Sequence, residues 1–203
     1  MATSDVEICN LALDKCKEKN ITSLEENTKA AEKCKAWYDL IRKSLLTNLN
    51  ASFAIDRAVL AKKTDYIKIY GYDNAYQLPF KCLQVLNVGN PLENILYQVE
   101  GDNFYCNVNE KNIYIRYIKD VEDVTKFDSD FIRLFALTLA SEICEPLTHD
   151  TEQANYLKKL AQEQYIICSV KYGRDNRITT IRNSRFREAK LRAEIDIANN
   201  YIR

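Results

Sequence analysis

The sequence predicts an α+β protein that is mainly α: an antiparallel helix bundle with an inserted small antiparallel β-platform and an extended C-terminal arm. Apolar residues recur at helical spacing before residue 50 and after residue 128, whereas the spacing shortens in between. A basic segment of different composition follows residue 173. Only four glycines and three prolines interrupt the chain, which argues against a many-turned β-sandwich or a glycine-rich nucleotide-binding fold.

Two helices are predicted at the N-terminal end, and we expect them to form an antiparallel hairpin. Ser4 with Glu7 makes a capping box, in which each side chain satisfies a backbone N–H of the first turn. Ser23 with Glu26 repeats the pattern and predicts a second helix that runs to about residue 49. The predicted inward faces are Ile8, Leu11, Ala12 and Cys16 in the first helix, and Ala30, Cys34, Trp37, Ile41 and Leu45 in the second.

The middle of the chain predicts one antiparallel sheet of three or four strands. Residues 81–88 are apolar, and residues 112–118 alternate between two faces. Segments 95–100 and 104–108 flank a Gly-Asp pair that fits a hairpin turn. Residues 66–76 are rich in tyrosine and turn formers.

Two more helices are predicted towards the C-terminal end. Asp128 is an N-cap, with Asp130 in the first turn near the positive end of the helix dipole. The residues that follow are apolar on nearly every side, so this helix should be central and buried, ending at Pro146 and the polar residues after it. Asp150 starts the last helix, and Gly173 is its predicted C′ stop.

These predictions divide the chain into four parts. Residues 1–58 form the N-terminal helical hairpin, residues 59–122 the β-platform, residues 123–173 the helices that complete the bundle, and residues 174–203 the arm.

Composition bounds the function. The chain has 29 basic and 29 acidic residues, so the whole molecule has no electrostatic bias towards nucleic acid or membrane. Seven scattered cysteines without a CxxC pair, in a chain that opens without a secretory pattern, predict free buried thiols in a reducing cytosol. No stretch approaches the roughly 18 apolar residues of a membrane span, so we expect no membrane contact.

The sequence offers no convincing catalytic or metal site. The only histidine, His149, could pair with Cys144, but a buried cysteine beside a loop histidine explains both residues more simply. Four aspartates between residues 120 and 130 could surround a hard cation, yet helix capping accounts for the last two. No phosphate-binding glycine motif and no zinc-ligand cluster occur. We therefore expect no enzyme activity, no cofactor and no metal.

Two groups of residues are predicted to bind partners. Between residues 177 and 192, six basic residues stand against one glutamate and alternate with large apolar side chains, which favours folding onto an acidic, grooved protein surface. Thirteen tyrosines suit interface surface. The predicted arm site comprises Ile178, Ile181, Arg182, Arg185, Phe186, Arg187, Leu191, Arg192 and Ile195, and the predicted platform site comprises Tyr70, Tyr72, Tyr76, Tyr97 and Tyr105.

Several segments together carry a resemblance to a known family. They read VEICNLALDKCKEKNITSLEENTKAAEKCKAWYDLIRKSLL, YQLPFKCLQVLNV, QVEGDNFYCN and IYIRYIKDVEDVTKFDSDFIRLFALTLASEICEPLT. In this order, from about residue 5 to about residue 172, they resemble the head-to-tail adaptors of short-tailed bacteriophages, also called tail tubular protein A. The family's glycine in the first loop is missing at residues 17–20, and its tryptophan after the second helix is replaced around Phe53.

The resemblance implies a virion ring, typically of twelve subunits, assembled in the host bacterial cytoplasm at the junction of head and tail. The implied partners are other copies of the chain, the portal protein against which the C-terminal segment lies, nozzle or other tail proteins, and the passing genomic DNA. Such a ring needs no active site. Two alternatives from the residues themselves are a DNA-binding regulator that uses the basic arm and a tail-borne cell-wall hydrolase with two convergent carboxylates.

Overall fold

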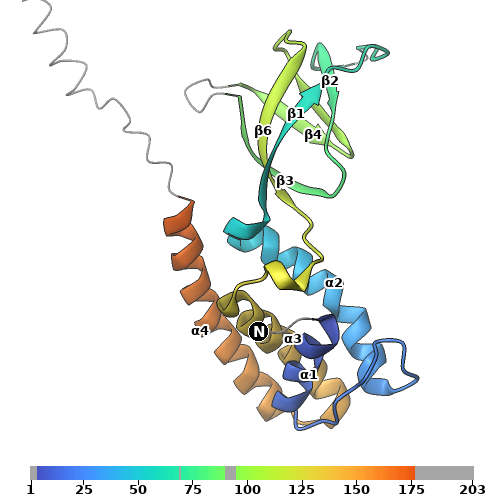
Figure 1. Ribbon diagram of the computed structural model, residues 1–203, viewed down its shortest axis with the longest axis vertical. Helices are drawn as coiled ribbons and strands as arrows, with labels where there is room; N and C mark the ends of the chain where they lie inside the picture. Colours follow the sequence, from blue (N-terminus) through green and yellow to red (C-terminus); the bar gives the residue numbers. More distant parts are fainter. Residues whose placement is uncertain (1–3, 69, 90–94, 177–203) are drawn as a thin grey trace, which may run out of the picture.

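A computed structural model describes residues 4–68, 70–89 and 95–176 and shows a mixed helix and sheet protein. Its described residues form four α-helices at one end of an elongated molecule and two small antiparallel sheets at the other (Figure 1). The elements are α1 (Asp5–Lys15), α2 (Lys29–Leu49), η1 (Ser52–Ala54), β1 (Ile55–Ala61), β2 (Asn74–Gln77), β3 (Cys82–Val88), β4 (Tyr97–Glu100), β5 (Asn103–Cys106), β6 (Asn112–Lys119), η2 (Val124–Lys126), α3 (Ser129–Thr148) and α4 (Thr151–Asp175).

Three of the predicted helix starts are confirmed. The side chain of Ser4 accepts from the N–H of Glu7 at 3.2 Å, Asp128 from Phe131 at 3.0 Å, and Asp150 from Gln153 at 2.9 Å. Each cap satisfies a backbone donor that has no partner within its helix.

The predicted start of the second helix is wrong. The Glu26 carboxylate turns back to accept from the N–H groups of Thr22 and Ser23, which closes a turn ahead of the helix. Helix α2 begins at Lys29, and Thr28 caps it through the N–H of Ala31 at 3.2 Å. Ser23 and Glu26 therefore close the loop before α2 and do not cap the helix.

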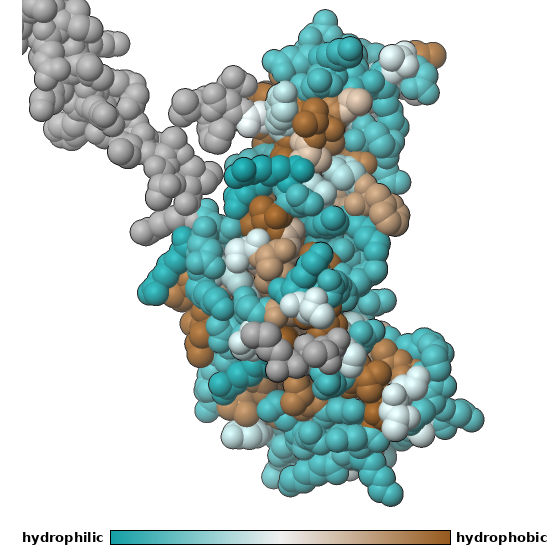
Figure 2. Space-filling view, in the orientation of Figure 1, coloured by the Kyte–Doolittle hydropathy of each residue, from teal (hydrophilic) through white to brown (hydrophobic). Residues whose placement is uncertain are grey.

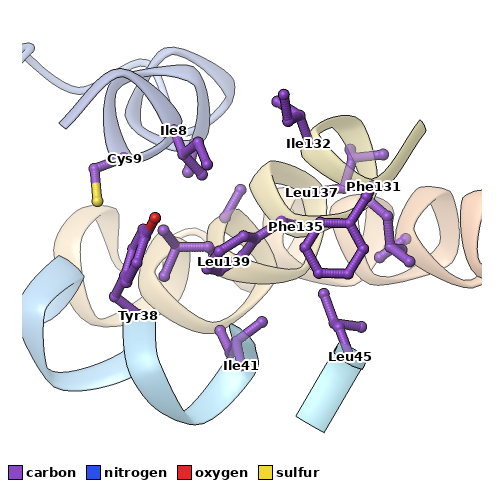
Figure 3. Close-up of a cluster of buried hydrophobic side chains, with 14 of the residues drawn as sticks. Ile8, Cys9, Tyr38, Ile41, Leu45, Phe131, Ile132, Phe135, Leu137 and Leu139 are labelled. Atoms are coloured by element: carbon purple, nitrogen blue, oxygen red, sulfur yellow. The ribbon is translucent and has the colours of Figure 1, made fainter. Parts of the chain in front are cut away.

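Helix α3 is the centre of the helical end, as its sequence predicted. Helices α1, α2 and α4 all pack on it, and α1 and α2 contact α3 far more extensively than they contact each other, so the expected hairpin is a minor contact. The prediction that Leu11 faces the core is wrong, because its side chain is 42% exposed, whereas Cys9 and Leu13 are buried. Figure 3 shows Ile8, Tyr38, Ile41, Leu45 and Phe135 meeting in this core.

Helix α3 ends at the polar residues where its end was predicted, whereas α4 runs past its predicted end. Pro146 lies inside α3, which continues to Thr148, and His149 closes the helix in the left-handed conformation with φ of 58°. Pro146 lacks the backbone donor that would reach the carbonyl of Glu142, but the helix continues past it, and the N–H of His149 donates to the carbonyl of Glu145 at 2.9 Å. Gly173 likewise lies inside α4, where Asn176 is the C-cap.

The β-region contains two sheets in place of the single predicted one. Strands β1 and β2 were missed, and the predicted boundary at residue 58 falls inside β1. The strand orders are β1-β6-β3 and β2-β5-β4, all antiparallel. Between the sheets lies a second core made of Leu60, Tyr76, Val88, Phe104, Cys106, Ile113, Ile115 and Tyr117.

A buried ion pair joins the two ends of the molecule. The chain enters the sheets through β1 and leaves through β6, and these neighbouring strands place Ile55 opposite Ile118. Just after β6, Asp120 (7% exposed) pairs with Arg42 of α2 (1% exposed). The same guanidinium donates to the carbonyl of Val121 at 2.8 Å and to Asp39 at 3.0 Å. Helix α2 is thereby fixed to the exit of the central strand.

Removing one partner of this pair should destabilise the protein severely. Arg42→Met leaves the Asp120 carboxylate and the Val121 carbonyl buried without their donor, which should lower the free energy of unfolding by about 3–5 kcal/mol in urea denaturation. The double variant Arg42→Met with Asp120→Leu should recover part of this loss. Lys43→Ala is the control, because Lys43 lies 3.7 Å from Asp120 but is half-exposed and should matter by less than about 1 kcal/mol. Equal losses in all three variants would contradict the assignment.

Candidate interaction surfaces

The predicted platform tyrosines fall into two groups. Tyr70, Tyr72 and Tyr105 line one pocket of about 220 Å³, together with Tyr66, Gly71, Gln98 and Glu100. The loop between β1 and β2 supplies the residues before 73, and the outer face of the β2-β5-β4 sheet supplies the others, because Gln98 lies opposite Tyr105 in the strand register. We call this the tyrosine pocket.

Local contacts shape the tyrosine pocket. The hydroxyl of Tyr66 donates to the backbone carbonyl of Tyr72 at 3.0 Å, which holds the loop closed on itself. The rings of Tyr66 and Tyr105 stand 5.7 Å apart between centroids, tilted by 56°. Tyr70 is 92% exposed at the mouth. Sequence reasoning missed Tyr66, although its place in the tyrosine-rich loop was a usable signal.

Tyr76 and Tyr97 do not belong to this surface. Tyr76 is fully buried between the sheets, where its hydroxyl donates to the carbonyls of Val108 and Glu110 at 3.1 and 2.8 Å, so its prediction as a partner-facing residue is wrong. The reason is the unrecognised strand β2, which turns this side chain into the second core. Tyr97 is partly exposed and stacks on Phe104 at 5.1 Å, away from the pocket lining.

Helix α4 presents an apolar ridge. Ile166, Ile167 and Val170 lie within little more than one turn. Tyr156 is on the same face ten residues earlier, and the exposed Lys159 and Glu163 stand on that face between them. The three aliphatic side chains and Tyr156 are about half-exposed or more, with Ile166 at 62%. Figure 2 shows brown surface along the edge of the molecule where α4 runs in Figure 1. A run of this kind on a helix face is typical of an interface.

A groove of about 610 Å³ lies at the surface between α1 and α3. Leu11, Ile132 and Ala136 contribute its apolar part, which explains why Leu11 is not in the core. Asp14 and Arg133 are among the charged residues along it. This α1–α3 groove shares no residue with the α4 ridge.

The end of α4 is fixed beside the sheets. The side chain of Asn176 donates to the carbonyl of Asn50 at 2.7 Å and accepts from the guanidinium of Arg116 on β6 at 2.8 Å. Ser52 and Asp175 lie 3.4 Å apart at the same place. The nine predicted arm residues lie outside the described residues. The chain therefore continues towards them from the junction between helices and sheets.

The aspartates between residues 120 and 130, which could have surrounded a cation, instead make structural contacts. Asp120 binds Arg42, and Asp123 caps η2 through Thr125. Among the described residues no three His, Cys, Asp or Glu side chains are placed to hold a metal ion. Asp128 and Asp130 both pair with Lys171, at 3.3 and 2.7 Å.

The other residues that could carry out catalysis, His149 and the cysteines, are not hydrogen-bonded to each other or are buried. Cys144 is buried with its sulfur 3.7 Å from the hydroxyl of Thr148, whereas His149 is exposed, and no hydrogen bond joins the two. All seven cysteines are free; six are buried and Cys82 is partly so, as predicted. Burial raises the pKa of the thiols of Cys82, Cys106 and Cys168. These thiols are poor nucleophiles at neutral pH.

The sequence was compared with protein-family models and with curated proteins, and it matches none of them. Within the part of the chain described above, no helix has the length and apolar character required to cross a bilayer.

Asp128 ties the two C-terminal helices together, and its ionisation should control stability in acid. Burial opposes its charged form, but the N–H of Phe131, the hydroxyl of Tyr172 at 2.7 Å and the ammonium of Lys171 together hold its pKa below the ordinary value. Burial, and then the Asp128 carboxylate, raise the pKa of Tyr172, so its hydroxyl stays a donor.

Tyr172→Phe should therefore lower the free energy of unfolding by about 1–2 kcal/mol at neutral pH, because a charged acceptor loses a donor. The native pKa of Asp128 lies below the unfolded value, so its stabilisation is present above about pH 4 and disappears as the pH falls through the native pKa. Urea denaturation across this range should show the variant and the natural protein converging in acid. Tyr165→Phe, on the same helix but without a hydrogen bond, is the control; a gap that persists in acid would contradict the assignment.

Proposed function

We propose that this chain is a structural subunit of a bacteriophage virion, in which copies form a ring that joins the portal of the head to the tail and lets the genomic DNA pass. The observation that carries the proposal is the pair of unlike apolar surfaces on the helical end, the α4 ridge and the α1–α3 groove. The sequence resemblance to head-to-tail adaptors supports the same conclusion.

Ring geometry demands such a pair. A closed ring of more than two subunits is built from head-to-tail contacts, so each subunit must carry two different patches that complement each other. The ridge exposes Ile166 and Ile167, while the groove is a hollow in which Leu11 is 42% exposed and Ile132 is largely buried. The ridge of one copy then packs into the groove of the next, and repetition around an axis closes the ring, typically with twelve subunits.

The remaining parts fit the same assembly. The nine arm residues, from Ile178 to Ile195, are proposed to bind the portal, and Asn176 fixes the point from which they depart. The tyrosine pocket lies at the far end of the molecule from the helices and is proposed to face the nozzle or another tail protein. On this proposal the protein acts through its interfaces and carries out no chemical reaction.

A charge placed on either ring surface should block assembly. Ile167→Asp on the ridge and Leu11→Asp in the groove should each abolish ring formation with the portal of the same phage, because an apolar contact cannot desolvate an unpaired carboxylate. Mass photometry and negative-stain images report ring, dimer and monomer directly. Leu40→Asp is the matched control, since Leu40 on α2 is somewhat more exposed than Leu11 and Ile167 but belongs to neither surface.

A mixture of the two variants tests the head-to-tail arrangement itself. The ridge variant keeps an intact groove and the groove variant keeps an intact ridge, so the mixture should form dimers through the one remaining good contact and should not form rings. Rings from the mixture, or from either variant alone, would refute the proposed interface. A natural chain that stays monomeric whether or not portal is present would refute the ring function.

The arm should be required for portal binding and not for folding. A chain that ends at Asn176 keeps both cores and the anchor to Asn50 and Arg116, so its thermal unfolding should change little. Its affinity for purified portal should fall by at least about tenfold in surface plasmon resonance, because on this proposal the arm residues supply the contact. Full affinity without the arm would show that the portal binds elsewhere.

A further inference from the structure

We propose that the tyrosine pocket binds the guanidinium group of an arginine side chain presented by a protein partner. Four of its seven lining residues are tyrosines, and the only charged one is Glu100. Aromatic faces attract organic cations through the ring quadrupole, and a carboxylate supplies the counter-charge. This ligand chemistry goes beyond the ring function and does not depend on it.

The charge around the pocket favours a cation. The segments that build it, residues 66–73 and 97–105, contain three carboxylates and one ammonium. That ammonium, on Lys68, is already paired with Asp73. A second ammonium, on Lys63, donates to Asn103, which lies opposite Glu100 in the strand register. Even with Lys63 counted, three carboxylates stand against two ammonium groups around the pocket. The Nε2 of Gln98 donates to one oxygen of Glu100 at 2.8 Å, which fixes the carboxylate at the pocket wall.

Size and shape favour a single planar side chain. About 220 Å³ is below the roughly 300–1,000 Å³ typical of sites for drug-sized ligands. Tyr66 and Tyr105 stand as a tilted pair, and the bond from Tyr66 to the carbonyl of Tyr72 keeps the loop in place before a ligand arrives. A guanidinium stacks on aromatic rings and donates in a fork to a carboxylate, which the compact, strongly hydrated ammonium of lysine does less well.

The test uses the full chain with isotope-labelled tyrosine rings, observed by NMR during titration with N-acetyl-arginine methylamide. We expect saturable shifts of the Tyr66, Tyr72 and Tyr105 signals. The neutral isostere N-acetyl-citrulline methylamide should bind at least about tenfold more weakly, since it lacks the charge. The lysine derivative should fall between the two.

Two matched variants locate the counter-charge. Glu100→Gln should weaken arginine binding about fivefold. Asp102→Asn removes an equal charge from a residue that does not line the pocket, so it should change the affinity for arginine by less than about twofold. Both side chains are exposed, so neither change should unfold the protein. Equal binding of arginine and citrulline derivatives, or unchanged arginine binding by Glu100→Gln, would overturn the inference. A chain that still assembles into rings while failing this test would leave the ring proposal standing.

Discussion

A buried ion pair between Arg42 and Asp120 is the central polar contact that joins the two ends of this molecule. The sheets are inserted between α2 and α3, and the chain crosses between the ends only on entering β1 and on leaving β6. A buried guanidinium is costly unless its donors are satisfied, and here Asp39, Asp120 and the Val121 carbonyl satisfy them. Because these acceptors lie on α2 and just beyond β6, satisfying the charge also holds the two ends together.

The proposed interaction surfaces follow from that fixed arrangement. The α4 ridge and the α1–α3 groove are both built on helices that pack against α3, so the shared core sets their separation. The tyrosine pocket lies on the outer face of the second sheet, with its own core beneath it. Asn176, bonded to Asn50 and Arg116, sets where the arm begins. The proposed contacts with neighbouring copies, portal and tail would then fall on separate parts of one subunit.

Local signals in the sequence predicted the helices better than the sheets. Caps at Ser4, Asp128 and Asp150 depend on residues within three positions, and the structure confirms each of them. Ser23 and Glu26 form an equally local pattern, but the helix start that it predicts is wrong, because the same donors and acceptors can close a turn as well as cap a helix. Strand β2 spans four residues and gave no readable alternation, so the burial of Tyr76 was missed.

The sequence by itself determined the helical regions, the central buried α3, the reduced cysteines inside the core and the presence of a tyrosine-rich surface. These depend on periodicity and composition, which act over a few turns of chain. Only the tertiary structure decided that the β-region divides into two sheets, that Leu11 faces a groove, and that Tyr66, Tyr72, Tyr105 and Glu100 meet in one pocket. These features join residues about 30 or more positions apart, and no local propensity encodes which distant strand or helix a side chain will meet.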